Sequence, residues 1–152
     1  MGLFGIPSKK EREIKAQQIK NCNRILTDSL KIMMSTENID TFLSRLNDAK
    51  GAILMAWSIA GENTKCMIQE STPKECMDSL ERDSAEALNA CIDRYMRKKT
   101  IKISELTKGR LQKAKGLELV VEEYAASMPP ECIEHWKWSV KKLISKIEKL
   151  ES

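Results

Sequence analysis

The stretch from Thr72 to Met96, TPKECMDSLERDSAEALNACIDRYM, decides the fold class. It opens with an N-cap threonine, a proline at the first helical position (Pro73) and a glutamate at the third (Glu75), a combination that fixes the start of a helix. Apolar side chains then recur at steps of four or seven residues, at Cys76, Leu80, Ala87, Cys91 and Tyr95. This spacing places them on one face and predicts a long amphipathic helix.

The apolar pattern continues beyond this stretch in a poorer form. It can be threaded on a helix as far as Ala126, with interruptions at Gly109 and Gly116. One unbroken helix over residues 73–126 would be roughly 80 Å long at 1.5 Å per residue, more than twice the span of a compact bundle of this size. We therefore expect this third helical region to bend, break or protrude. The alternation over residues 100–104 also permits a short extended piece.

A capping box marks the start of the first helix. Ser8 and Glu11 stand three residues apart, so that each side chain can accept a hydrogen bond from the backbone N–H of the other residue. The apolar positions that follow are Ile19, Cys22, Leu26, Leu30 and Met33. These signals predict an amphipathic helix from Ser8 to about Ser35.

A second helix is predicted to begin at Asn38 or Asp40, since both residue types are favoured as N-caps. Its apolar stripe is formed by Phe42, Leu46, Ala49, Ile53, Trp57 and Ala60. Gly61 would end this helix, because glycine in a helix interior costs about 1 kcal/mol relative to alanine. The alternative is a helix that runs on through Cys66 to Gln69.

The sequence Met128-Pro129-Pro130 cannot lie inside a helix, because proline lacks a backbone N–H and clashes with the preceding turn. It separates the third helical region from a final helix that starts at about Pro130. The apolar positions of this helix alternate steps of three and four: Ile133, Trp136, Val140, Leu143, Ile147 and Leu150. We expect Trp136 in the apolar seam and Trp138, two residues on, at an edge or a contact.

These elements imply an all-α antiparallel bundle of four helices, or five if the third region breaks at Gly109 or Gly116. The chain has 152 residues with only six glycines and four prolines, and it shows no internal repeat and no linker. Its length matches one ordinary domain. We therefore expect residues 1–152 to form a single helical domain, with residues 1–7 as an apolar N-terminal arm that folds back onto the helices.

No segment of the sequence is typical of a membrane protein. The longest nearly apolar run, Ile53 to Ala60, is far shorter than the roughly 20 residues that span a bilayer. The N-terminus is apolar first and basic afterwards, the reverse of a secretory signal, and Ile6 stands where a myristoylation motif needs Ser or Thr. We expect no membrane partner and a cytoplasmic location.

The five cysteines are an odd number without a Cys-x-x-Cys pair, a pattern that suggests neither a disulfide framework nor a zinc ribbon. We expect them to be small buried apolar side chains. Cys132 and the only histidine, His135, stand three residues apart on one helical face, but a structural zinc site needs four ligands and a catalytic one usually three. We therefore expect no metal and no other cofactor, and we place His135 on the helix surface beside Trp136.

The sequence carries no catalytic signature. It lacks a Gly-rich phosphate loop and a Glu-x-x-His pair of the kind that builds di-iron bundles. Glu134 and His135 are adjacent and so point to different faces of a helix. We therefore expect a protein that is not an enzyme and that has no small-molecule substrate.

The best indication of function is a basic segment from Arg94 to Lys115. It holds nine Lys or Arg residues against one acid, Glu105, so its net charge is +8 and the rest of the chain, whose total charge is +4, carries −4. The charge of the protein is therefore polarised along the sequence. The candidate contact residues are Arg94, Arg97, Lys98, Lys102, Lys108, Arg110 and Lys113.

Two kinds of partner suit this segment. A protein partner, or a second copy of the chain in a homo-oligomer, could meet it with a complementary surface, and the chain has an acidic flank of its own. Nucleic acid is the alternative, because clustered Lys and Arg release counterions from phosphates. The segment lacks interleaved aromatic residues for base stacking, and no helix-turn-helix is evident. We therefore expect a non-enzymatic adaptor or regulator that binds a protein or itself. The acidic flank consists of Asp78, Glu81, Asp83, Glu86 and Asp93.

Two longer stretches of the chain, NRILTDSLKIM (23–33) and TENIDTFLSR (36–45), and two short ones, GLFG (2–5) and IDRY (92–95), form a familiar pattern. The pattern resembles that of small helical proteins and domains of Gram-positive bacteria and their mobile elements. The chain departs from the pattern at Ile39, where a proline would be usual, and at Leu43, where an aromatic residue would be. The group has no established activity. The resemblance therefore implies a bacterial or mobile-element origin and adds no catalytic residue.

Overall fold

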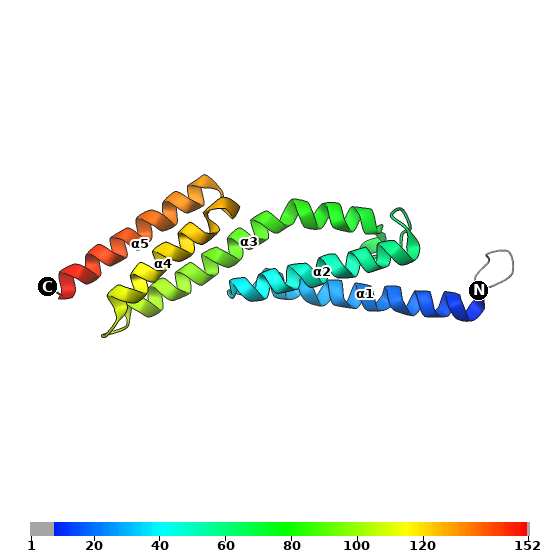
Figure 1. Cartoon of the computed structure of the whole chain (residues 1–152), viewed down its shortest axis with the longest axis horizontal. Helices are drawn as coiled ribbons and strands as arrows, with labels where there is room; N and C mark the ends of the chain where they lie inside the picture. Colours follow the sequence, from blue (N-terminus) through cyan, green and yellow to red (C-terminus); the bar gives the residue numbers. More distant parts are fainter. Residues whose placement is uncertain (1–7, 152) are drawn as a thin grey trace. The chain divides into compact units, whose positions relative to one another are not determined.

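Five α-helices make up most of the computed structural model, which describes residues 8–151 (Figure 1). The helices are α1 (Lys9–Ser35), α2 (Ile39–Ala60), α3 (Pro73–Ser104), α4 (Arg110–Tyr124) and α5 (Pro130–Glu151), with short 3-10 turns at Ile68–Glu70 and Ala125–Ser127. No strand occurs within the described residues, and the predicted all-α class is confirmed in its five-helix form. None of the described helices is long and apolar enough to cross a membrane. The predicted arm, residues 1–7, lies outside the described residues.

Capping hydrogen bonds are present at both predicted helix starts. The Glu11 N–H donates to Ser8 Oγ at 3.1 Å, and α1 begins directly after Ser8. At α3 the box is reciprocal: the Thr72 N–H donates to Glu75 Oε1 and the Glu75 N–H donates to Thr72 Oγ1, each at 3.1 Å. Each bond satisfies a backbone donor that would otherwise lack a partner at the helix start. The predicted starts of these two helices are therefore confirmed.

The second helix ends at Ala60, so the alternative that runs on to Gln69 is wrong. Gly61 has a φ of +89°, in the left-handed region, and its N–H still donates to the Trp57 carbonyl oxygen at 2.8 Å. A glycine in this conformation closes the last turn of a helix at little steric cost. The chain then leaves the helical path, and Cys66 lies in the connection that follows.

The third helical region breaks at Gly109, as the five-helix form of the prediction requires. α3 ends at Ser104 and α4 begins at Arg110, with Gly109 as its N-cap at a φ of +67°. A side chain would be strained in this left-handed conformation, so glycine suits the position. Gly116, the other candidate break, lies inside α4.

Residues 100–104 continue α3, so the alternative of a short extended piece is wrong. Ile103 lies seven residues after Met96, and both side chains are buried, at 4% and 0% exposure. Seven residues are close to two helical turns, so the two side chains share one face. Burial of this face outweighs the strand-like alternation of the local sequence.

The two tryptophans of α5 lie as predicted. Trp136 is 4% exposed and Trp138 is 60% exposed. The buried residues of α5 are Trp136, Val140, Leu143, Ile144 and Ile147. Four of them were expected in the seam and Ile144 is an addition, whereas the expected Ile133 is half-buried and Leu150 is 62% exposed. The steps of three and four in the sequence therefore identified the buried face of this helix.

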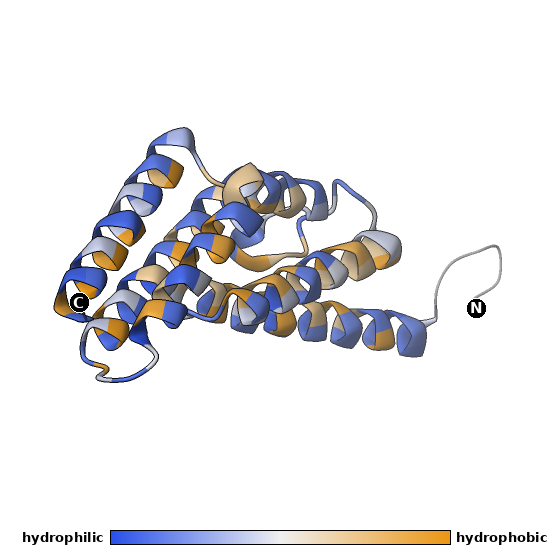
Figure 2. Cartoon of the chain, turned by 60° about the vertical axis from the view of Figure 1, so that its left-hand side comes forward, coloured by the Kyte–Doolittle hydropathy of each residue, from blue (hydrophilic) through white to orange (hydrophobic). Residues whose placement is uncertain are grey.

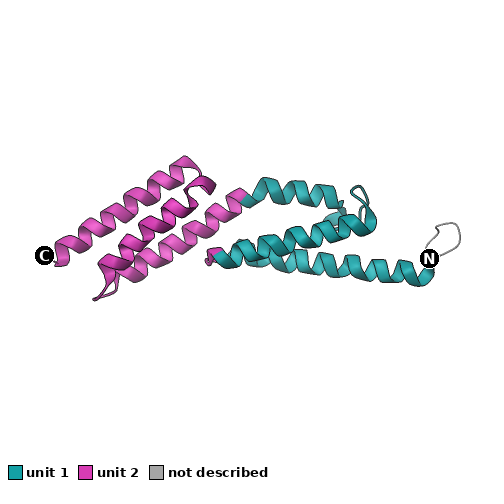
Figure 3. Ribbon diagram, viewed as in Figure 1, with its two compact units in different colours: residues 1–35, 40–84 teal, residues 36–39, 85–152 magenta. Residues whose placement is uncertain are grey.

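The chain divides into two compact units (Figure 3). Unit 1 comprises residues 1–35 and 40–84, and unit 2 comprises residues 36–39 and 85–152, so that α3 contributes to both. In unit 1, α1 and α2 form an antiparallel hairpin (Figure 1). The buried apolar residues of unit 1 are Cys22, Leu26, Met33, Phe42, Ala49, Ala52, Ile53, Ala56, Met67 and Leu80. The expectation that residues 1–152 fold as a single domain stays a prediction.

Unit 2 is built from the second part of α3 together with α4 and α5, which follow one another in opposite directions (Figure 1). The hydropathy colouring shows hydrophobic and hydrophilic residues alternating along these helices (Figure 2). The buried apolar residues are Ile39, Cys91, Ile92, Met96, Ile103, Ala114, Leu117, Val121, Met128, Trp136, Val140, Leu143, Ile144 and Ile147. All nine residues of the basic segment belong to this unit.

Candidate functional site

Arg94, the first residue of the basic segment, is tied to the backbone within its own unit. Its Nε and Nη2 donate to the Thr36 carbonyl oxygen at 3.0 Å and 2.8 Å. The side chain is half-buried. A guanidinium suits this position because its planar fork holds two donors toward one acceptor. Arg94 therefore links α3 by hydrogen bonds to Thr36, in the connection between α1 and α2.

Three further candidate residues pair with carboxylates inside unit 2. Arg97 Nε lies 2.7 Å from Asp93 Oδ2, one turn earlier on α3. Arg110 Nε lies 3.0 Å from Glu151 Oε1, and the Arg110 side chain is only 18% exposed. The third pair joins Lys98 and Glu37. These carboxylates offset part of the charge that the sequence concentrates in the segment.

An open groove lies between the second part of α3 and α4, within unit 2. Its cavity volume is about 360 Å³. Apolar side chains from both helices line it, and three lysines stand among them. The lining residues are Tyr95, Lys99, Lys102, Ile103, Leu106, Lys113, Gly116, Leu117 and Val120. We call this site the lysine groove.

Helical spacing brings the groove residues to one face of each helix. On α3, Tyr95, Lys99 and Lys102 stand four and three residues apart, and on α4, Lys113 and Leu117 stand four apart. The connection between the helices reverses the chain direction at Gly109. The two faces can therefore line one groove although their residues are separated in sequence.

The three lysines of the groove form no ion pair with any described residue. Lys102 and Lys113 are exposed, and Lys99 is half-buried with its Nζ 5.7 Å from the centroid of the Tyr95 ring. This geometry is within the range of a cation–π interaction. The groove thus combines three ammonium groups with an apolar lining, which suits a ligand that carries both acidic and apolar groups.

A second, smaller cavity adjoins the lysine groove on α3. Its volume is about 220 Å³, and it shares Tyr95, Lys99 and Lys102 with the groove. The remaining residues that line it are Glu37, Asn38 and Lys98. Glu37 and Lys98 form an ion pair in this smaller cavity, whereas Lys113 lines only the lysine groove.

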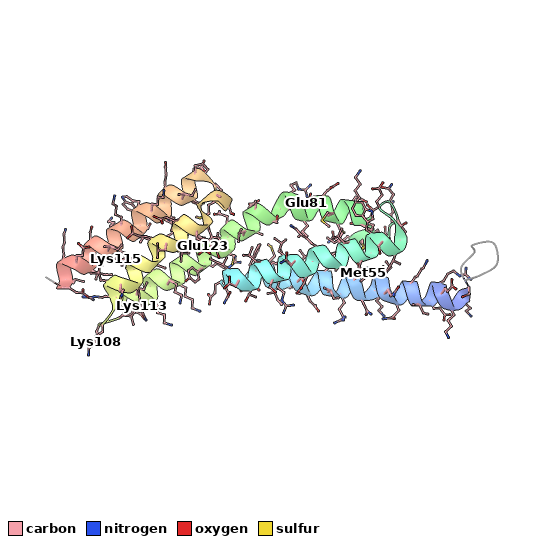
Figure 4. The ribbon with its side chains drawn as sticks, viewed as in Figure 1. Met55, Glu81, Lys108, Lys113, Lys115 and Glu123 are labelled. Atoms are coloured by element: carbon pink, nitrogen blue, oxygen red, sulfur yellow. The ribbon has the colours of Figure 1, made fainter. Side chains whose placement is uncertain are left out.

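Lys108 and Lys115 belong to the basic segment but do not line the groove. Lys108 stands at the tip of the connection between α3 and α4 (Figure 4). Lys115 is on α4, two residues after Lys113, and so points to a different side of the helix. Both residues are exposed. They provide matched controls for the groove lysines, because they carry the same charge in the same segment.

The structure thus sorts the seven candidate residues into different environments. It brings Lys102 and Lys113 together in the groove, and adds Lys99 and Tyr95, which sequence reasoning did not select. A pattern that could have indicated the α3 side is the i, i+4, i+7 spacing of Tyr95, Lys99 and Lys102. The α4 side required knowledge of how the two helices are rotated against each other. That any of the seven residues contacts a partner stays a prediction.

Cys132 and His135 lie near the start of α5 without further ligands around them. Cys132 is half-buried, and His135 is exposed with its ring in edge contact with Trp136, at a centroid distance of 4.8 Å. Within residues 8–151, no group of three or more His, Cys, Asp or Glu side chains is placed to hold a metal ion. His135 is therefore a surface residue beside Trp136, as the sequence indicated.

Three cysteines from separate elements of unit 1 lie close enough to affect one another. Burial raises the pKa of the Cys22 thiol, and a neighbouring charge at Cys66 raises it further. Burial likewise raises the pKa of Cys66, and burial followed by the charges of Glu75 and Cys66 raises the pKa of Cys76. The side chain of Asn23 positions this site: its Nδ2 donates to the Cys66 carbonyl oxygen at 2.9 Å, and its Oδ1 accepts from the Ile68 N–H at 3.0 Å.

Because the pKa values of Cys22, Cys66 and Cys76 are raised, we expect the free energy of unfolding to fall at alkaline pH. Their folded pKa values lie above the ordinary value of 9.0, so the unfolded chain releases thiol protons first as the pH rises. This contribution to stability is fully present below about pH 9 and is lost as the pH rises through the folded pKa values. We expect the free energy of unfolding to fall less between about pH 8 and pH 10 in a Cys22→Ala/Cys66→Ala variant than in the wild type.

Urea denaturation at the two pH values measures this difference. Met34→Ala, which alters an exposed residue and removes no thiol, is the control and is expected to retain the wild-type pH dependence. Equal pH dependence in the wild type and the double variant would contradict the prediction.

No protein-family model, no curated protein and no solved structure matches the chain.

Proposed function

We propose that the protein is a non-enzymatic helical binding module whose lysine groove receives a protein segment with acidic and apolar side chains. The observation that carries the proposal is the presence, in an apolar groove of about 360 Å³, of three lysines that pair with no carboxylate of residues 8–151. An amphipathic helix fits such a groove by placing its apolar face on the lining and its carboxylates on the rim. The charges would set specificity and association rate, and the apolar contact would slow dissociation.

The distribution of charge favours protein over nucleic acid as the partner. Affinity for a phosphate backbone depends on how many phosphates the Lys and Arg residues neutralise. Arg97, Lys98 and Arg110 already pair with carboxylates, and Arg94 is engaged by a backbone carbonyl. Nucleic-acid binding through residues 94–115 is retained as the alternative, and the experiment below separates the two.

Thiol chemistry also supports a binding role. A nucleophilic cysteine needs a lowered pKa, whereas burial raises the pKa of Cys22, Cys66, Cys76 and Cys91. These thiols therefore remain protonated at neutral pH. The cytoplasmic location and the bacterial or mobile-element origin expected from the sequence are part of the same proposal.

The groove can be tested with a fluorescently labelled amphipathic peptide that carries Leu and Glu at helical spacing. We expect it to bind the wild type, and we expect Lys102→Glu/Lys113→Glu to weaken binding at least about tenfold, or about 1.4 kcal/mol. Fluorescence anisotropy measures both dissociation constants. A peptide in which glutamine replaces every glutamate tests whether the acidic groups are required.

The control is Lys108→Glu/Lys115→Glu, which changes the net charge by the same amount outside the groove. It is expected to bind the acidic peptide within about twofold of the wild type. The alternative is tested by measuring the affinity for duplex DNA of arbitrary sequence at several salt concentrations. Micromolar DNA affinity with a steep negative salt slope, weakened equally by both double variants, would make nucleic acid the partner.

A further inference from the structure

The first part of α3 carries a second charged surface, which we call the acidic stretch, residues 78–86. It contains one base, Arg82, and four acids, so its net charge is −3. The acids are Asp78, Glu81, Asp83 and Glu86. All five side chains are exposed. Glu81 projects from α3 in Figure 4.

Most of this negative charge is uncompensated in the described part of the chain. Asp83 pairs with Arg82 at 3.1 Å, on the surface. Asp78, Glu81 and Glu86 form no ion pair with a described residue. Within the described residues, three carboxylates on one stretch of helix and three ammonium groups in the lysine groove therefore form no ion pair.

The spacing of the two sets of charges is also compatible. Asp78 and Glu81 stand three residues apart, about 4.5 Å along the helix axis, and so do Lys99 and Lys102. Ala85 is exposed on the same face as Asp78 and Glu81, and its short side chain permits a close approach to another surface. Leu80 is buried in the chain's own core, so the stretch would engage the groove mainly through its carboxylates, with Ala85 as its apolar contact. A helix that carries this stretch can therefore align two carboxylates with two lysines on α3 while Lys113 faces it from α4.

We propose that the occupant of the lysine groove is the acidic stretch of a second copy of this chain. The inference rests on the proposed function, because it names the partner of the same groove. Since the groove and the stretch are different surfaces, the contact is heterologous, and each copy offers one of each. Assembly is accordingly dependent on protein concentration. It is weakened by salt, because the Debye length falls from about 10 Å at 0.1 M to about 3 Å at 1 M.

Sedimentation velocity of the full chain at low and high salt tests the inference. The wild type is expected to form species larger than a monomer as its concentration rises at low salt. Lys102→Glu/Lys113→Glu, which alters the groove, and Asp78→Lys/Glu81→Lys, which alters the stretch, are each expected to remain monomeric. An equimolar mixture of the two variants is expected to regain larger species, because the intact stretch of one can enter the intact groove of the other.

Charge-matched controls separate this contact from a general effect of net charge. Lys108→Glu/Lys115→Glu and Glu123→Lys/Glu131→Lys alter exposed residues outside the groove and the stretch, and both are expected to associate like the wild type. Glu123 is labelled in Figure 4. Circular dichroism checks that every variant retains its helices. If the controls lose association as fully as the test variants, the inference is overturned.

The experiment also distinguishes failure of this inference from failure of the proposed function. The stretch variant keeps its groove, so it is expected to bind the acidic peptide as a monomer. A wild type that binds the peptide but remains monomeric at every concentration would overturn self-association and leave the groove as a binding site. If association occurs but the stretch variant still assembles like the wild type, the acidic stretch is not the occupant. Absence of peptide binding to the stretch variant would remove the proposed function itself.

Discussion

Replacement of Trp136 by alanine is expected to lower the free energy of unfolding by about 3–5 kcal/mol. The indole is 4% exposed and lies in the α5 seam with Val140 and Leu143. Alanine would remove most of its buried apolar surface and leave a cavity that the surrounding helices can fill only in part. Urea denaturation followed by far-UV circular dichroism measures the loss without relying on tryptophan fluorescence.

Trp138 provides the matched control two residues away on the same helix. It is 60% exposed, and its ring contacts Lys142, whose Nζ lies 4.5 Å from the ring centroid. Loss of this exposed cation–π contact in Trp138→Ala costs about 0.5–1 kcal/mol. Similar losses for the two variants would show that the α5 seam is assigned to the wrong face. The wild-type curve is informative too, because a single transition observed by several probes is expected if the chain folds as one domain.

Replacement of Arg94 by alanine is expected to cost about 1.5–3 kcal/mol, the range measured for hydrogen bonds of charged groups. The change removes both donors from the Thr36 carbonyl oxygen, a contact between residues 58 positions apart in the sequence. Arg94→Lys is expected to recover only part of the loss, because an ammonium lacks the planar pair of donors. Urea denaturation again measures these values, at a pH near neutrality.

Arg97→Ala is the control for Arg94, because Arg97 is also an arginine of α3 in the basic segment. Its side chain is 68% exposed and pairs with Asp93 one turn away, an arrangement worth about 0.3–0.5 kcal/mol. We expect Arg94→Ala to lower stability while peptide binding by the folded protein is maintained. Equal stability of the two variants, or a binding defect without a loss of stability in Arg94→Ala, would contradict the structural role of Arg94.

Local signals in the sequence were sufficient to place the starts of the first and third helices. The capping residues Ser8 and Thr72 act on backbone N–H groups within the same turn, so their effect does not depend on distant parts of the chain. Gly109 likewise allows a left-handed conformation through its lack of a side chain. The burial of Trp136 and the exposure of Trp138 followed from the periodicity of α5.

The partners of charged side chains could not be predicted in the same way. Lys98 meets Glu37 from 61 positions away, and Arg110 meets Glu151 from 41 positions away. The net charge along the sequence counts each of these cations equally, whether or not a carboxylate of the same chain pairs with it. Only the packing of helices within unit 2 shows which of them already have a counter-ion.

By itself, the sequence determined the all-α class, the helix starts at Ser8 and Thr72 and most of the buried face of α5, because caps and helical periodicity are properties of neighbouring residues. It left open whether the chain forms four helices or five and where the second helix ends. The tertiary structure alone decided that Lys99, Lys102 and Lys113 share an apolar groove and that Arg94 supports the fold. It also brought the thiols of Cys22 and Cys66 together. These outcomes depend on how helices distant in sequence are rotated and packed against one another, and no local pattern of residues specifies that rotation.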